Sequence, residues 1–242
     1  MKKEERMVRT NGIPKIIETF KAGDVKVSVI TPAFKIEDEI DGQKILKNLE
    51  RYGRVCYKSE GRITSESAGS FLQNAMKRGH FSIIEHEKVT VRVICDRGVT
   101  HEWVRHRVAS YSQESTRYCN YGKLGFQYIY PFFVKFPSQE YAEWKQAVTD
   151  ATLHYLNLLK YGWTPQEARG VLPNSLKTEI IVTHNIREWR HFFYLRCSAG
   201  AHHQIREISL LLLKEFQKRI PVLFDDFKID ETKMIATTKI IT

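Results

Sequence analysis

The stretch KVTVRVICDRGVTHEWVRHRVASYSQESTRYCNYG, residues 88–122, contains a strand pattern, a helix pattern and a polar loop pattern in succession. Lys88 to Cys95 alternates apolar and polar residues and is rich in valine, which predicts a half-buried strand. A short helix carrying HEWVRHR is expected after Gly98. Residues 108–122 are polar and show no period, so we interpret them as a loop.

The flanking sequence adds further strands and several long helices. Apolar residues recur at helical spacing in residues 41–57, for example. Asn185, with Glu188 three residues later, resembles a capping box at the start of the helix that reaches Arg196. Strands are expected at residues 25–30, 127–133 and 177–183, and the second of these is strand-like only as far as Pro131. Helices are expected at residues 41–57, 65–78, 140–161, 164–172, 185–196 and 202–219. These elements lack the regular alternation of a doubly wound sheet, which favours an α+β fold with a mixed or antiparallel sheet packed with long helices. We expect one domain over residues 25–242, after a loosely ordered extension over residues 1–24.

Composition narrows the class of protein. The chain has 242 residues, 42% of them hydrophobic, which is enough for one domain with a real core. Its four cysteines lack metal-ligand spacing, which fits free thiols in a reducing compartment. No uncharged apolar run approaches the roughly 20 residues that cross a bilayer, so we expect the cytoplasm. The net charge of +10 favours an anionic partner without distinguishing nucleic acid, phosphorylated metabolites and membrane surfaces.

The most concentrated group of chemically active side chains lies within residues 105–118. Cations and hydroxyls gather there with little apolar cover: Arg105, His106, Arg107, Ser110, Ser112, Gln113, Ser115, Thr116 and Arg117. Guanidinium groups offer planar forks of donors to phosphate, and hydroxyls can complete such a site. Composition alone would equally fit a solvated basic loop.

The spacing in this segment is more specific than its composition. Arg-His-Arg, two residues, Ser, four residues, Ser, one residue, Arg resembles the signature of the flavin-dependent thymidylate synthases. The resemblance continues in family order at residues 79–91, GHFSIIEHEKVTV, at residues 167–173, EARGVLP, and at residues 185–197, NIREWRHFFYLRC. It extends from Arg54 to Asp226. It implies conversion of dUMP to dTMP with FAD as cofactor, with 5,10-methylenetetrahydrofolate and NADPH as co-substrates, in a homotetramer whose active sites are shared between subunits.

The resemblance also assigns roles to individual residues. Flavin contacts are expected from Ser82, Glu85, Arg105, His106, Arg107, Gln113, Asn185, Arg187 and His191. Contacts with dUMP are expected from Glu102, Arg105, Gln113, Glu114, Ser115, Thr116, Arg117, Arg169 and Arg196. Arg196 is the expected catalytic residue, because a fixed guanidinium stabilises the negative charge that develops on an activated pyrimidine. The alternative for Arg196 is a last-turn arginine that complements the helix dipole.

Helix geometry bears on how these residues are used. At 100° per residue, Arg187 and Arg196 lie on opposite sides of one helix, so the helix would separate two sites or face two subunits. Adjacent histidines on a helix also point about 100° apart, so His202 and His203 are assigned no metal, and none is expected elsewhere. Cys119 is interpreted as a small packing residue.

An RNA-binding module is the alternative from a different class. Arginines interleaved with tyrosines could contact phosphates and stack on bases. The tyrosines are Tyr111, Tyr118, Tyr121, Tyr128 and Tyr130. No RNP-like motif accompanies them, whereas the enzyme signature is complete. We therefore expect dUMP, folate and NADPH as partners, and neither nucleic acid nor a membrane.

Overall fold

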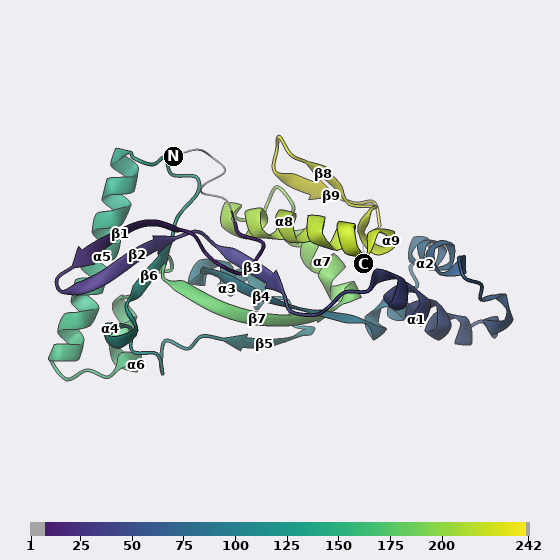
Figure 1. Cartoon of the computed structure of the whole chain (residues 1–242), viewed down its shortest axis with the longest axis horizontal. Helices are drawn as coiled ribbons and strands as arrows, with labels where there is room; N and C mark the ends of the chain where they lie inside the picture. Colours follow the sequence, from purple (N-terminus) through teal and green to yellow (C-terminus); the bar gives the residue numbers. More distant parts are fainter. Residues whose placement is uncertain (1–7, 241–242) are drawn as a thin grey trace. The chain divides into compact units, whose positions relative to one another are not determined.

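The computed structural model describes residues 8–240 and has a mixed α+β fold (Figure 1). Its contacts divide the chain into two compact units. The first unit comprises the described residues up to Lys35, Arg92–Arg105 and Tyr111–Ile181; the second comprises Ile36–Val91, His106–Ser110 and the described residues from Val182 on. The single domain expected over residues 25–242 stays a prediction.

The first unit is built on a sheet with the order β1-β2-β6. Its elements are β1 (Ile16–Ala22), β2 (Val25–Ile30), α3 (Arg97–Trp103), α4 (Tyr121–Leu124), β6 (Phe126–Ile129), α5 (Gln139–Lys160), α6 (Pro165–Ala168) and the 3-10 helix η4 (Arg169–Val171). Strands β1 and β2 are antiparallel, whereas β2 and β6 are parallel, so this sheet is mixed. Gly23 adopts a φ of +59° in the β1–β2 turn, a conformation that glycine accepts without a steric penalty.

Helix α5 crosses this sheet and supplies much of its core (Figure 1). The ring of Tyr155 on α5 meets Phe126 edge to face, with centroids 5.5 Å apart. The buried Tyr128 hydroxyl lies 2.9 Å from the Thr152 hydroxyl, so a polar group inside the core has a partner. Cys119 packs against the same cluster, in agreement with its expected packing role.

The second unit is largely helical. Its elements are α1 (Gly42–Val55), the 3-10 helix η2 (Glu60–Arg62), α2 (Ser67–Lys77), the 3-10 helix η3 (Phe81–His86), α7 (Ile186–Arg196), α8 (His203–Arg219), α9 (Pro221–Phe224), β8 (Lys228–Asp230) and β9 (Ile235–Thr237). Buried aromatic rings join α7 to α8. The ring centroid of Phe216 lies 5.2 Å from that of Trp189 and 5.3 Å from that of Phe193. This packing fixes α7, the helix that carries the predicted site residues Arg187, His191 and Arg196.

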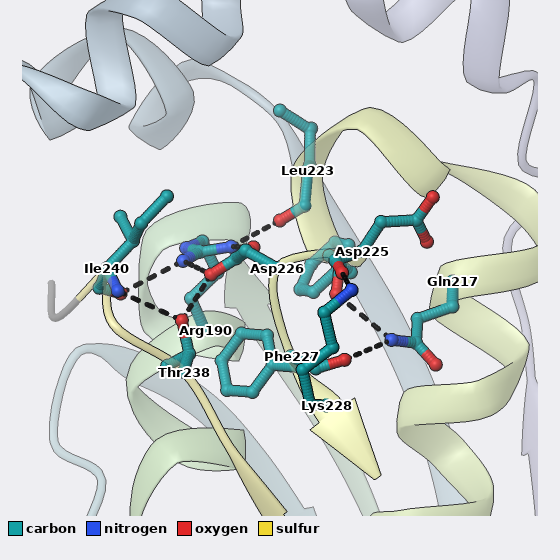
Figure 2. A network of polar contacts seen from close by, with 10 residues as sticks. Arg190, Gln217, Leu223, Asp225, Asp226, Phe227, Lys228, Thr238 and Ile240 are labelled. Carbon is teal, nitrogen blue, oxygen red and sulfur yellow. Dashed lines mark hydrogen bonds and ion pairs between the residues drawn. The ribbon is translucent and has the colours of Figure 1, made fainter.

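A buried arginine ties α7 to the C-terminal segment (Figure 2). Arg190 is fully buried and donates to both carboxylate oxygens of Asp226, each at 2.7 Å. It also donates to the carbonyls of Leu223 and Ile240, and it lies 5.0 Å from the ring centre of Phe227. The two terminal nitrogens of the guanidinium therefore donate to carboxylate and carbonyl oxygens, whereas the buried Nε has no hydrogen-bond partner among the described residues.

A second sheet has the order β3-β4-β7-β5 and comprises β3 (Ala33–Ile36), β4 (Lys88–Asp96), β7 (Lys177–Asn185) and β5 (Ala109–Gln113). The division of the chain into units falls within these strands. In β4 the alternating burial matches the expected half-buried strand. None of the helices within residues 8–240 is long and apolar enough to cross a membrane.

Two expectations about irregular segments were wrong. Residues 16–22, expected in a loosely ordered extension, form β1, and residues 109–113, expected in a loop, form β5. Both strands are mostly exposed or half-buried, so neither leaves a hydrophobic pattern in the sequence. Backbone pairing with a neighbouring strand holds them instead. The first seven residues of that extension lie outside the described residues.

Candidate active site

The predicted site residues fall into two sets, one in each unit. The second unit contains Ser82, Glu85, His106, Arg107, Asn185, Arg187, His191 and Arg196; the first unit contains Glu102, Arg105, Gln113, Glu114, Ser115, Thr116, Arg117 and Arg169. The segment 105–118 is therefore divided between the two units, and because it contains β5 it does not form one continuous loop.

Helix α7 organises the set in the second unit. Asn185 caps it by accepting a hydrogen bond of 2.8 Å from the Glu188 amide, as the capping pattern predicts. Arg187 follows in the first turn and donates to Glu85 at 2.6 Å. With Val108, Glu188 and His191, these residues line a hollow of about 420 Å³, which we call the α7 hollow. Ser82 lines a different hollow, together with Arg187.

The centre of this set is a hydrogen-bonded chain of three side chains, Glu188, His106 and Arg196. His106 Nδ1 lies 2.9 Å from Glu188 Oε1, and Arg196 Nε donates to His106 Nε2 at 3.1 Å. A guanidinium can only donate, so His106 Nε2 must accept and the imidazole proton must sit on Nδ1. The Nδ1–H group then donates to the Glu188 carboxylate. Glu188 was not among the predicted site residues, because its place in the sequence indicates only a capping role.

The electrostatics agree with this pattern of donors and acceptors. Burial lowers the pKa of His106, the hydrogen bond to Glu188 opposes that shift, and the Arg196 charge adds to it, so the ring is neutral near pH 7. Burial raises the pKa of Glu188, but hydrogen bonds from His106 and His191 outweigh it and the net shift is downward. Glu188 is therefore an ionised carboxylate beside a neutral imidazole. Neighbouring His184 on β7 is also buried, which lowers its pKa to about 4.

Three of these residues have a spacing that a metal ion could use. One ligand atom each from His106, Glu188 and His191 lies within 4.8 Å of the others. The same atoms already share hydrogen bonds, and the Arg196 guanidinium beside His106 disfavours a further cation. We therefore interpret the cluster as a hydrogen-bond network and assign it no metal.

Arg105, in the first unit, and Arg107, in the second, flank His106 in the sequence and are exposed, whereas His106 is buried. Exposed guanidinium groups remain available to an anionic ligand. The histidine is instead committed to its protein partners. The Arg-His-Arg motif thus combines one internal and two external side chains.

In the first unit, two predicted dUMP contacts are largely occupied by protein partners. Gln113 donates to the hydroxyls of Thr100, at 2.9 Å, and Thr178, at 3.2 Å. Glu114 accepts from Lys177 at 2.7 Å and from the Tyr121 hydroxyl at 2.9 Å. These bonds hold the start of the 113–117 segment in place. Glu102 is half-buried on α3.

The remaining residues of this set form a turn with exposed cations. The Ser115 hydroxyl accepts from the Arg117 amide at 3.2 Å, and Arg169 donates to the Thr116 hydroxyl at 3.2 Å. The side chains of Arg117 and Arg169 are exposed. The Arg169 guanidinium thus lies beside a hydroxyl, whereas the Arg117 guanidinium lies 5.5 Å from the centre of the Tyr118 ring. Hydroxyls and exposed guanidinium groups are suitable donors for a phosphate.

Comparison with known proteins identifies the family. A family model described as thymidylate synthase complementing protein matches residues 41–222, more than half of the chain. A flavin-dependent thymidylate synthase of Geobacter sulfurreducens is 35% identical over 180 residues, covering 72% of this chain and 78% of that protein. One of Corynebacterium efficiens is 30% identical over 240 residues, covering 90% and 95%. One of Pyrococcus abyssi is 36% identical over 161 residues, covering 65% of this chain and 66% of its own length, just under two thirds. The chain therefore belongs to the family of flavin-dependent thymidylate synthases.

Proposed function

We propose that this enzyme converts dUMP to dTMP, taking the carbon from 5,10-methylenetetrahydrofolate and using FAD that NADPH reduces again. Family membership supports the reaction. The observation that carries the assignment of residues is the hydrogen bond of 3.1 Å between Arg196 and His106, because it joins the proposed pyrimidine arginine to the proposed flavin histidine.

The second unit's residues fit a flavin. The α7 hollow presents the donors of Asn185 and Arg187 at the first turn of a helix, where the helix dipole also favours an anionic group. In our proposal Arg187, Asn185, Glu85 and His191 hold the cofactor in this hollow, and exposed Arg107 adds positive charge. When bound, reduced FAD supplies the hydride.

For dUMP, we propose a division between phosphate binding and activation of the base. Arg117, Arg169 and the Ser115 hydroxyl bind the phosphate, which their exposure and charge support. Arg196 contacts the pyrimidine and stabilises the negative charge that develops there. A guanidinium already held by His106 provides this stabilisation without having to reorganise.

We further propose a homotetramer with active sites shared between subunits. The family resemblance supports it, as does the placement of Arg187 and Arg196 on opposite sides of α7. A reducing compartment such as the cytoplasm is also proposed, because Cys56, Cys95, Cys119 and Cys197 are free thiols.

The test replaces Arg196 and measures the two ligands separately. Arg196→Ala should lower dTMP formation by about a hundredfold or more, while the purified protein stays yellow and releases flavin on denaturation. Arg219→Ala removes an arginine paired with Glu215 on the surface of α8 and serves as the matched control. Loss of flavin from Arg196→Ala with retained dUMP affinity would contradict the assignment. A colourless wild-type protein that takes up no added FAD would overturn the proposed function itself.

A further inference from the structure

We propose that Glu188 is a positioning residue: it fixes His106 in the tautomer that receives the Arg196 guanidinium and thereby orients Arg196 toward the pyrimidine. The inference rests on the proposed function for the role of Arg196. Nothing in the family signature, Arg-His-Arg with its serines and arginine, includes Glu188.

The geometry first specifies which groups donate. Arg196 Nε approaches His106 Nε2 at 3.1 Å, and Glu188 Oε1 approaches His106 Nδ1 at 2.9 Å. With the proton on Nε2 instead, two donors would face each other on one side of the ring. On the other side, a lone pair would face the carboxylate. The Nδ1–H tautomer satisfies both contacts, so both partners favour it, and the carboxylate is the partner that accepts from the protonated nitrogen.

The burial of this network makes the selection strict. The side chains of His106 and Glu188 are 1% and 10% exposed, so water is a poor substitute for either partner. Free imidazole side chains prefer the opposite tautomer, with the proton on Nε2. An acceptor at Nδ1 is therefore required to hold His106 in the less common form.

The position of Glu188 on α7 also points to a site role. A glutamate three residues after an Asn cap usually returns its carboxylate to the cap amide. Here Asn185 accepts from the Glu188 amide, while the Glu188 carboxylate is bonded by His106 and, at 3.2 Å, by His191. One helical turn thus supplies both the cap and the acceptor that organises the histidines.

The pH dependence provides a signature that packing alone would not produce. Among the described residues, the titratable groups in contact with His106 include His184 from β7 and Glu188, His191 and Arg196 from α7. Protonation of His106 removes the lone pair that Arg196 needs, so activity should fall on the acid side. Because Glu188 raises the pKa of His106, removing its charge should move this acid limb to lower pH.

The experiment compares Glu188→Ala with Glu188→Gln, which keeps an acceptor oxygen but loses the charge. Nitrogen NMR of the FAD-loaded protein with labelled histidine reports the His106 tautomer, and steady-state kinetics report kcat and the KM for dUMP. Glu188→Ala should lose the Nδ1–H tautomer and show a kcat lower by about tenfold to a hundredfold, with KM and bound flavin little changed. Glu188→Gln should keep the tautomer, recover most of kcat and shift the acid limb to lower pH.

Glu50→Gln is the matched control. Glu50 is another buried carboxylate of the second unit, paired with Arg54 at 2.7 Å, and its replacement should leave the His106 tautomer unchanged. Wild-type kcat or an unchanged tautomer in Glu188→Ala would overturn the proposal. A Glu188→Gln variant as inactive as Glu188→Ala would also overturn it, because the charge would then matter and the hydrogen bond would not. The NMR result stands even for a wild-type protein that forms no dTMP, so failure of the proposed function would be recognised separately.

Discussion

Replacing Asp226 with alanine tests the buried ion pair that ties α7 to the C-terminal segment (Figure 2). The Arg190 side chain is 0% exposed and Asp226 is 19% exposed, and the carboxylate accepts two hydrogen bonds of 2.7 Å from the guanidinium. Removing one partner of a buried pair leaves an uncompensated charge and costs about 3–5 kcal/mol. Because Asp226 is partly exposed, water can reach the vacated position, and we expect about 3 kcal/mol.

A double-mutant cycle separates this charge effect from general loss of packing. Arg190→Met also destabilises, since the carbonyls of Leu223 and Ile240 lose their donor. In the Arg190→Met background, however, Asp226→Ala no longer strands a charge and should cost less than about 1 kcal/mol. The coupling free energy between the two positions should therefore be about 2 kcal/mol.

Urea unfolding at one fixed protein concentration is the assay, because association would change the apparent free energy of unfolding. Glu231→Ala is the control: its exposed pair with Lys214 also joins the C-terminal segment to a helix, but such a pair contributes at most about 1 kcal/mol. A loss of stability in Asp226→Ala no larger than that in Glu231→Ala, or a cycle without coupling, would refute a stabilising buried ion pair between Arg190 and Asp226.

Two further predictions concern stability. Burial lowers the pKa of His184 to about 4 from the ordinary 6.5. Between these two pH values the His184 side chain is protonated in the unfolded chain and neutral in the folded protein. The free energy of unfolding therefore falls as the pH drops from 6.5 to about 4. From about pH 7.5 to about pH 5 the loss should be about 2 kcal/mol, and urea titrations of His184→Asn should lack this contribution. A Cβ at Gly42 would lie 2.1 Å from the Arg219 carbonyl oxygen, so Gly42→Ala should cost at least about 2 kcal/mol in thermal unfolding. Gly61→Ala is the contrast, because no described atom lies within 4 Å of its Cβ, and an unchanged Gly42→Ala protein would contradict the geometry.

Local sequence patterns predicted those helices and strands that have a clear spacing of apolar residues or a cap of their own. The helix expected at residues 140–161 is α5, Gln139–Lys160, and the strand expected at residues 88–95 is β4, Lys88–Asp96. In both cases the spacing of the apolar residues indicates which face of the element is buried. The expected cap of α7 at Asn185 is confirmed for the same reason, since a cap depends on residues within one turn.

Strands β1 and β5 could not be predicted this way. The sequence of β5, ASYSQ, is polar, and its side chains are exposed or half-buried. What makes it a strand is its place beside β7, more than sixty residues later in the chain. Pairing of this kind depends on backbone groups that are distant in the sequence, so the periodicity of the side chains does not predict it.

The candidate site shows the same division. Motif spacing indicated Arg196 and His106 separately, whereas their hydrogen bond and its third member, Glu188, come from the structure. A signal for Glu188 was present: it stands three residues before His191, so both lie on one face of α7. In the sequence that spacing also fits an ordinary helical pair, and a cap offered a sufficient local explanation.

The Arg-His-Arg motif can be understood from the different positions of its members. His106 is buried and bonded at both ring nitrogens, so its replacement would leave Glu188 and Arg196 without their shared partner. Arg107 is exposed, so its replacement would chiefly change the charge presented to a ligand. The two outer positions of the motif therefore require a positive charge, which arginine supplies and lysine could partly supply. The central position has a stricter requirement, which histidine meets. A neutral imidazole ring donates at one nitrogen and accepts at the other, and so links a carboxylate to a guanidinium.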